Sequence, residues 1–225
     1  MFVYSLAGLK VDGEATEEVE IADSPITARL GVYQELARLF GGADRDSYEA
    51  AVEGSWPGRL AKDAKLLPYA FDYGAASVDA SVSAEEFQAE YLRLFEVGGI
   101  GGPPAPLFGG CYGGGDRMKK MEDVVRFYEY FGLHASAEDP RPPDHLSTEL
   151  EFMKFLAYKE AASASVRLQA SFRRAQLDFS EREVGRWLPE LTAAVEANKP
   201  LPFWKWAVTT ANAFVAADAA YMRSL

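Results

Sequence analysis

One stretch constrains this chain more than any other, the segment PPDHLSTELEFMKFLAYKE from Pro142 to Glu160. Its two prolines end whatever element precedes them. Asp144 then has the position and the side chain of a helix N-cap, with Ser147 as the alternative cap one turn later. Apolar residues recur behind the cap at helical spacing, in a stripe broad enough for a largely buried helix. The stripe consists of Leu146, Leu150, Phe152, Met153, Phe155, Leu156 and Ala157.

Three polar residues, Asp144, His145 and Glu149, lie in the first turn of this predicted helix, where core packing does not require them. His145 and Glu149 are four residues apart and therefore share one helix face. We expect the functional site here. The alternative is that these side chains only cap the helix and pack against its neighbours.

The rest of the chain repeats the helical periodicity, with no convincing strand alternation and no internal repeat. The pattern predicts one all-α domain, residues 1–225, of about eight to ten helices. Residues 1–23 are expected to be an irregular N-terminal arm, and 139–143 a hinge-like loop. Besides the segment above, the expected helices are Pro25–Phe40, Asp46–Glu53, Leu60–Phe71, Ser83–Phe95, Met118–Phe131, Val166–Leu177, Arg182–Ala197 and Phe203–Met222, with breaks at Ser55–Gly58 and Phe179–Ser180.

A loop rich in glycine and proline, Gly98–Gly115, separates two of these helices and holds nine of the 19 glycines. It lacks the Gly-Lys pair of a phosphate-binding Walker loop. It also has Pro104 where a dinucleotide fingerprint would need its third glycine. We therefore favour a flexible connection between two helical halves, a hinge or a lid, over a nucleotide site.

The net charge of −11 argues against nucleic acid as a partner, because phosphates demand a basic surface. It favours cationic partners, although the charge could also serve solubility alone. A single cysteine excludes an internal disulfide and fits a reducing compartment. No secretory signal and no run of 18 apolar residues are found, so we expect a cytoplasmic protein without stable membrane insertion.

The candidate metal ligands Cys111, His134, His145 and Glu149 are too few for a tight site, and HLSTE is not the H-E-x-x-H zinc signature. We expect no metal and no other cofactor. Cys111 shows no sign of an activated nucleophile. A small-molecule enzyme using His145 with Glu149 as an acid–base or metal pair remains an alternative, as does a structural subunit of a larger complex. The tryptophans follow helical spacing and are assigned to the core.

Four stretches, in this order, carry a resemblance to a known family. They are Glu90–Phe95 (EYLRLF), the proline-rich turn Pro103–Tyr112, Tyr128–Leu133 (YEYFGL) and Pro143–Met153 (PDHLSTELEFM). Together they resemble the TorD/DmsD/NarJ family of redox-enzyme maturation chaperones. The glycine-rich loop is most similar to chaperones of the type II dimethyl sulfoxide reductase group, which includes nitrate, selenate and chlorate enzymes.

The resemblance implies a cytoplasmic chaperone rather than an enzyme. Such proteins bind the apo catalytic subunit of a molybdenum oxidoreductase of the dimethyl sulfoxide reductase family, often through its twin-arginine leader. They hold this client until the molybdopterin cofactor is inserted. A leader with two arginines and an apolar helix needs an acidic rim beside a hydrophobic groove. The residues expected to bind the client are Asp144, His145, Glu149, Glu90, Tyr91, Phe95, Phe108 and Tyr112.

Overall fold

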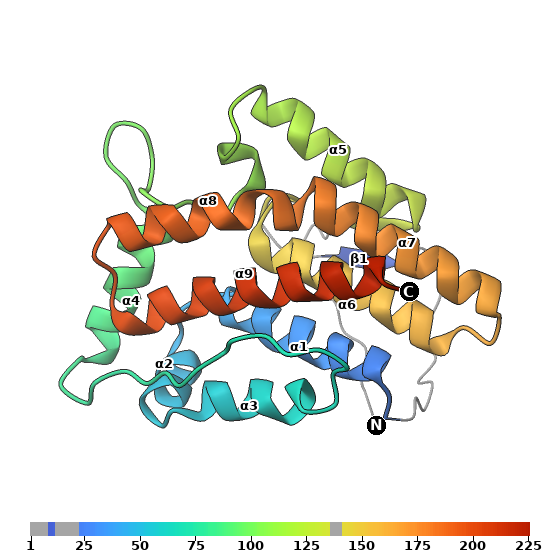
Figure 1. Ribbon diagram of the computed structural model, residues 1–225. Helices are drawn as coiled ribbons and strands as arrows, with labels where there is room; N and C mark the ends of the chain where they lie inside the picture. Colours follow the sequence, from blue (N-terminus) through green and yellow to red (C-terminus); the bar gives the residue numbers. More distant parts are fainter. Residues whose placement is uncertain (1–8, 12–22, 136–140) are drawn as a thin grey trace.

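The structure is a computed structural model that describes residues 9–11, 23–135 and 141–225 (Figure 1). The predicted all-α fold is confirmed, since helices form most of the described chain. In chain order they are α1 (Pro25–Leu39), α2 (Arg45–Val52), α3 (Ser55–Ala64), α4 (Ala84–Tyr91), α5 (Arg117–Tyr130), α6 (Leu146–Ala162), α7 (Val166–Arg182), α8 (Val184–Ala197) and α9 (Pro202–Arg223).

The predicted organising helix, α6, lies at the centre of the bundle, between α1 and α7 (Figure 1). All but three of its 17 residues are buried, including polar ones. α8 turns back along α9, and α9 in turn contacts α1 and α7. The apolar stripe of α6 is therefore covered on several sides, as the breadth of the stripe predicted.

Two helix starts form as local chemistry predicts. Ser24 caps α1 ahead of Pro25, and Ser83 with Glu86 forms the expected capping box at the start of α4. Behind α4 the chain continues as a short π-helix, η1 (Leu92–Glu96), which ends before Gly98.

The predicted break at Ser55–Gly58 is wrong, because α3 begins at Ser55 and ends at Ala64. Pro57 lies in the first turn of α3, where its missing N–H removes no intrahelical hydrogen bond, so it opens the helix rather than ending it. The predicted helix up to Phe71 is wrong as well. Residues 65–78 run along α9 mostly without helical structure, and the side chains of Tyr69 and Phe71 pack partly buried against the core.

The predicted break at Phe179–Ser180 is displaced by a few residues. α7 runs through both, which are buried, and ends at Arg182. A single residue, Glu183, with φ −118° and ψ −103°, separates α7 from α8. Burial of Phe179 among the rings of α5 and α6 keeps this part helical, which the polar sequence around it did not reveal.

One small antiparallel sheet was not predicted. β1 (Leu9–Val11) pairs with β2 (Leu133–Ala135), so that Lys10 lies opposite His134. Strands of three residues are too short for alternation to show. Apart from β1 and Asp23, the irregular arm predicted for residues 1–23 lies outside the described residues, as do residues 139 and 140 of the predicted hinge-like loop.

The glycine-rich loop divides into two parts. Residues 98–104 form an exposed hairpin at the left of Figure 1, with Gly99 bridged to Gly102 and Ile100 fully exposed. Residues 105–112 are held against the bundle and include a 3₁₀ turn, η2 (Gly109–Cys111). In the part of the chain that the structure describes, no helix is long and apolar enough to cross a membrane.

Candidate functional site

The start of α6 and the second part of the glycine-rich loop are joined through their backbones. Leu146 N donates to Leu107 O at 2.8 Å, and Gly109 N donates to Asp144 O at 2.8 Å. Between these bonds, Phe108 and His145 form an antiparallel bridge. The loop therefore adds a short extended segment beside the entry to α6, and several predicted site residues come together there.

Asp144 is 1% exposed and its side chain faces the loop. Its Oδ2 accepts from Gly110 N at 3.0 Å and lies 3.9 Å from Arg117 Nε. Its Oδ1 is buried and has no hydrogen-bond partner among the described residues. A Cβ on Gly110 would lie 2.9 Å from the Asp144 carboxylate, so a larger residue could not approach it this closely.

The N-cap of α6 is His145, which corrects the assignment of that role to Asp144 or Ser147. His145 Nδ1 accepts from Ser147 N at 3.2 Å, and its ring meets Phe108 edge-on with centroids 5.4 Å apart. The helix starts one residue later than expected because the Asp144 carboxylate is committed to the loop. Phe108 also lies under the Arg117 guanidinium, 5.2 Å from its centre, so a cation already covers this aromatic surface.

Glu149 is buried one turn further along, and its Oε2 accepts from Trp187 Nε1 at 3.1 Å. Burial raises the pKa of Glu149 well above its usual value, although the Trp187 hydrogen bond opposes the shift. Burial therefore favours the neutral form of the Glu149 carboxyl group. The sequence analysis assigned Trp187 only to the core and did not predict this contact. The adjacent glycines Gly109 and Gly110 could have indicated it, because glycines often mark a place where another group approaches the backbone closely. A Cβ on Gly109 would lie 2.6 Å from Trp187 Nε1.

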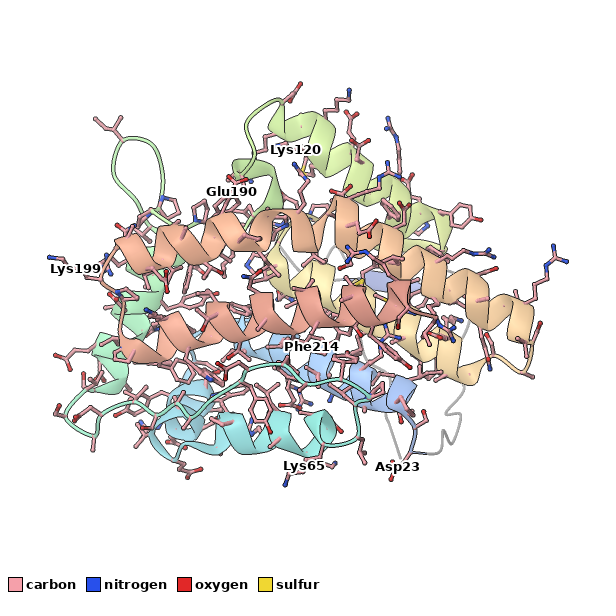
Figure 2. All side chains as sticks on the ribbon, in the orientation of Figure 1. Asp23, Lys65, Lys120, Glu190, Lys199 and Phe214 are labelled. Carbon is pink, nitrogen blue, oxygen red and sulfur yellow. The ribbon has the colours of Figure 1, made fainter. Side chains whose placement is uncertain are left out.

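Tyr112 completes this group of residues. Its ring stacks on Trp187, with centroids 5.3 Å apart and an interplanar angle of 10°. Its hydroxyl donates to Pro106 O at 2.7 Å. Lys120 of α5 donates to the Tyr112 carbonyl, and Glu190 of α8 accepts from Gly113 N; both are labelled in Figure 2. Side chains from two helices thus hold the end of the loop in place.

The remaining predicted residues, Glu90, Tyr91 and Phe95, lie in a separate region. Glu90 pairs with Arg93 at 2.6 Å and accepts from Leu201 N at 3.1 Å. Tyr91 and Phe95 are buried against Trp204. In this structure Glu90 faces the connector between α8 and α9, while the two aromatic rings belong to the core.

The two residues of the predicted acid–base pair have different partners. Glu149 is paired with Trp187, and the His145 ring bonds to Ser147. Burial raises the pKa of the Cys111 thiol, against the opposing charge of Arg117, which keeps it protonated at neutral pH. Within residues 9–11, 23–135 and 141–225, no group of three or more His, Cys, Asp or Glu side chains could hold a metal ion.

Comparison with known proteins points to the same family as the sequence motifs. The family model "Nitrate reductase delta subunit" matches residues 60–193. The chlorate reductase assembly chaperone protein of Ideonella dechloratans is 37% identical over 80% of this chain and 82% of its own length. The perchlorate reductase assembly chaperone protein of Dechloromonas aromatica is 31% identical over 84% and 87%.

The selenate reductase assembly chaperone protein of Thauera selenatis is 40% identical, but over 53% of this chain and 63% of its own length. No solved structure matches the chain significantly. The family model covers more than half of the chain, and two relatives align over most of it. The chain therefore belongs to the nitrate reductase delta subunit family, the NarJ/TorD family that its motifs indicated.

Proposed function

We propose that this protein is a dedicated assembly chaperone that binds the apo catalytic subunit of a molybdenum oxidoreductase of the dimethyl sulfoxide reductase family. In this role it works in the cytoplasm and holds the client for molybdopterin insertion. It has no catalytic activity of its own. The observation that carries the proposal is the similarity, over four fifths of the chain, to the chlorate reductase assembly chaperone.

We place the main client contact at the entry to α6, where Asp144 and His145 meet the glycine-rich loop. The unpaired Oδ1 of Asp144 supports this choice, because a buried carboxylate oxygen without a donor is costly unless a ligand supplies one. An arginine of the client's twin-arginine leader would supply such a donor. Access requires residues 105–112 to move, since the loop covers the carboxylate in this structure.

Phe108 and Tyr112 would move with that loop and offer their rings to an apolar segment of the client, while Glu149 would support Trp187 from beneath. Glu90 is a second proposed contact, since its side chain retains some exposure beside Arg93. Tyr91 and Phe95 are buried against Trp204 and would reach a client only if this packing opened.

The test is co-purification. A tagged form of the chain is recovered from cells that make an enzyme of the chlorate or selenate reductase type, and bound proteins are identified by mass spectrometry. We expect the catalytic subunit in a form without molybdenum. Recovery of the chaperone alone, while the apo subunit is present in the same lysate, would contradict the proposal.

A further inference from the structure

Arg117, in the first turn of α5, places its guanidinium group beside the Asp144 carboxylate at the entry to α6. Its Nε lies 3.9 Å from Asp144 Oδ2. The centre of the guanidinium lies over the Phe108 ring, 5.2 Å from the ring centre. The site that we propose for an arginine of the client therefore already has an arginine of this chain next to it.

The contact between Arg117 and Asp144 is an incomplete ion pair. A separation of 3.9 Å is longer than a hydrogen bond, whereas Arg173 approaches the buried Glu160 to 2.8 Å. Arg117 also faces Oδ2, the oxygen that already accepts from Gly110 N at 3.0 Å. The other oxygen, Oδ1, is buried and has no partner within the described residues. Arg117 thus lies close to the carboxylate but leaves unpaired the atom that most requires a donor.

The surroundings of the Asp144 carboxylate suit a guanidinium group better than an ammonium group. A guanidinium can donate to a carboxylate oxygen while its flat face stacks on an aromatic ring, and Phe108 supplies such a ring beside the carboxylate. A lysine brings a compact and strongly hydrated charge without a flat face. The combination of ring and carboxylate therefore favours arginine as the ligand of this site.

Two arginines cannot use this site at the same time. The Phe108 ring is only partly exposed, and His145 already meets it edge-on with centroids 5.4 Å apart. Arg117 covers the ring from another direction, and a second guanidinium at the same place would be repelled by its charge. A client arginine that pairs with Asp144 over this ring must therefore displace Arg117.

The environment of Arg117 allows this displacement. Its side chain is 51% exposed, so the guanidinium can turn into solvent without being desolvated on the way. The same side chain also packs on the loop, because a Cβ on Gly110 would lie 2.6 Å from Arg117 Cγ. Release of Arg117 therefore loosens the cover that residues 105–112 form over Asp144, which is the movement that client access requires.

We infer that Arg117 is an internal stand-in for the client's arginine, which must displace it in order to bind at Asp144. The inference rests on the proposed chaperone function and adds a residue that sets the affinity and the specificity of the same site. In the free protein, Arg117 offsets part of the cost of the buried carboxylate and competes with weak cationic ligands. A client arginine that reaches Oδ1 gains the hydrogen bond that Arg117 does not make.

A purely structural role for Arg117 predicts an effect of the opposite sign. If Arg117 only held the loop and the carboxylate in place, its removal would weaken the binding of an arginine ligand. If Arg117 competes with the ligand, its removal strengthens binding. Its ion pair is long and half exposed, and its contact with Phe108 is a single cation–π contact. We therefore expect an increase in affinity of about three- to tenfold.

The experiment titrates the full chain with the peptide acetyl-Ala-Arg-Arg-Ala-amide and follows the backbone amide signals of Gly109 and Gly110 by NMR. Both amides donate to Asp144, so they report on the site directly. A second peptide carries citrulline in place of both arginines, which keeps the shape and removes the charge. Wild type is compared with Arg117→Gln and with the matched control Arg126→Gln, which removes one positive charge from an exposed position of the same helix.

A further variant asks whether the gain in affinity depends on the Asp144 carboxylate. Asp144→Asn keeps an oxygen that can accept from Gly110 N, but it removes the negative charge. Adding Arg117→Gln to Asp144→Asn should leave the affinity unchanged, because an amide offers no charge for which two arginines could compete.

We expect Arg117→Gln to bind the arginine peptide more tightly than wild type by the factor given above. Arg126→Gln should differ from wild type by less than about twofold, because solvent screens an exposed charge. The citrulline peptide should show no gain with Arg117→Gln. Equal or weaker binding by Arg117→Gln, the same gain in Arg126→Gln or in the Asp144→Asn background, or no shifts of Gly109 and Gly110 in any protein would each overturn the inference.

Co-purification with the catalytic subunit separates this inference from the proposed function. If wild type and Arg117→Gln capture the apo subunit equally well and also bind the arginine peptide equally well, Arg117 is not a stand-in while the chaperone function stands. If Arg117→Gln binds the arginine peptide more tightly but neither protein captures a catalytic subunit, Arg117 does compete for the Asp144 site and the chaperone function is wrong.

Discussion

The two ends of α6 both carry buried charged residues, and they differ in how well those residues are paired. At the carboxyl end, Glu160 is completely buried among cations. Arg29 of α1 approaches it to 3.2 Å and Arg173 of α7 to 2.8 Å. At the amino end, Asp144 keeps one oxygen without a partner in the described structure, and burial raises the pKa of Glu149 well above its usual value.

The Arg29 cluster, which we define as Arg29, Glu160, Gln176 and Asp218, joins four helices. Arg29 Nε lies 2.5 Å from Asp218 Oδ1, and Arg29 Nη2 donates to Gln176 Oε1 at 2.7 Å. The hydroxyls of Tyr33 and Tyr69 donate to the same Asp218 carboxylate. Two carboxylates face one fully buried guanidinium and the partly buried Arg173, so nearly every polar atom has a partner.

This difference separates a structural role from a proposed binding role. A fully paired buried cluster fixes α1, α6, α7 and α9 relative to one another, and removing one member leaves the others uncompensated. A cluster with an unpaired carboxylate oxygen and a buried acid whose pKa is raised costs stability without fixing more of the fold. We expect a protein to keep such a destabilising cluster where a ligand completes the pairing of its polar atoms.

The largest effect should come from Arg29→Ala. The substitution leaves Asp218 and Glu160 facing each other without the guanidinium, and breaking a buried pair in this way costs about 3–5 kcal/mol of unfolding free energy. Chemical denaturation at pH 7 measures it. The control is Arg45→Ala, which removes an exposed pair with Glu49 at 2.9 Å and should leave the unfolding free energy nearly unchanged, because solvent screens exposed pairs. Equal losses in the two variants would mean that the Arg29 cluster does not stabilise the bundle.

The second effect tests the other end of α6. Replacing Asp144 and His145 together with alanine removes the helix cap and should cost on the order of 1 kcal/mol of stability. If they recognise the client, the loss of a charge-assisted hydrogen bond lowers its affinity by about 1.5–3 kcal/mol, more than tenfold. Melting temperature is compared with capture of the catalytic subunit.

The matched control is Leu150→Ala, one turn further along the same helix and fully buried. It should cost about 2–5 kcal/mol of stability while client capture stays normal below its melting temperature. Normal capture by the folded Asp144/His145 variant would remove the entry to α6 as the client site.

A smaller effect concerns Glu149. Its pKa is raised in the folded protein, so its contribution to stability is complete below the unfolded value of about 4.5 and is lost as the pH rises toward the folded pKa. The Glu149→Gln side chain does not titrate in this pH range. Between pH 5 and pH 8 the wild type should therefore lose stability relative to this variant, by at most about 1.4 kcal/mol per pH unit. Parallel stability curves would show that Glu149 is ionised in the folded state.

The smallest expected effect is a contrast in hydrogen exchange within the glycine-rich loop. Residues 98–102 are exposed, and their amides should exchange fast in the free protein. Gly109 and Gly110 donate to Asp144 and should exchange more slowly. Client binding should protect the hairpin, and strong protection of the hairpin in the free protein would argue against its role as a lid.

The sequence predicted those features that depend on interactions between residues close together in the chain. Caps such as Ser24 and Ser83, and the periodic stripe of α6, are set by neighbours within a few residues, and they appear in the structure as predicted. The family was evident from the same local motifs. The N-cap of α6 was displaced by one residue because a loop 34 residues away captured the Asp144 carboxylate.

The tertiary structure decided the pairings. Arg29 reads in the sequence as an ordinary helical residue, yet its partner Asp218 lies 189 residues away. The same holds for Trp187, whose partner Glu149 is 38 residues away. Periodicity determines which face of a helix is buried, whereas the charge state and the partners of a buried side chain depend on which distant helix is packed against it.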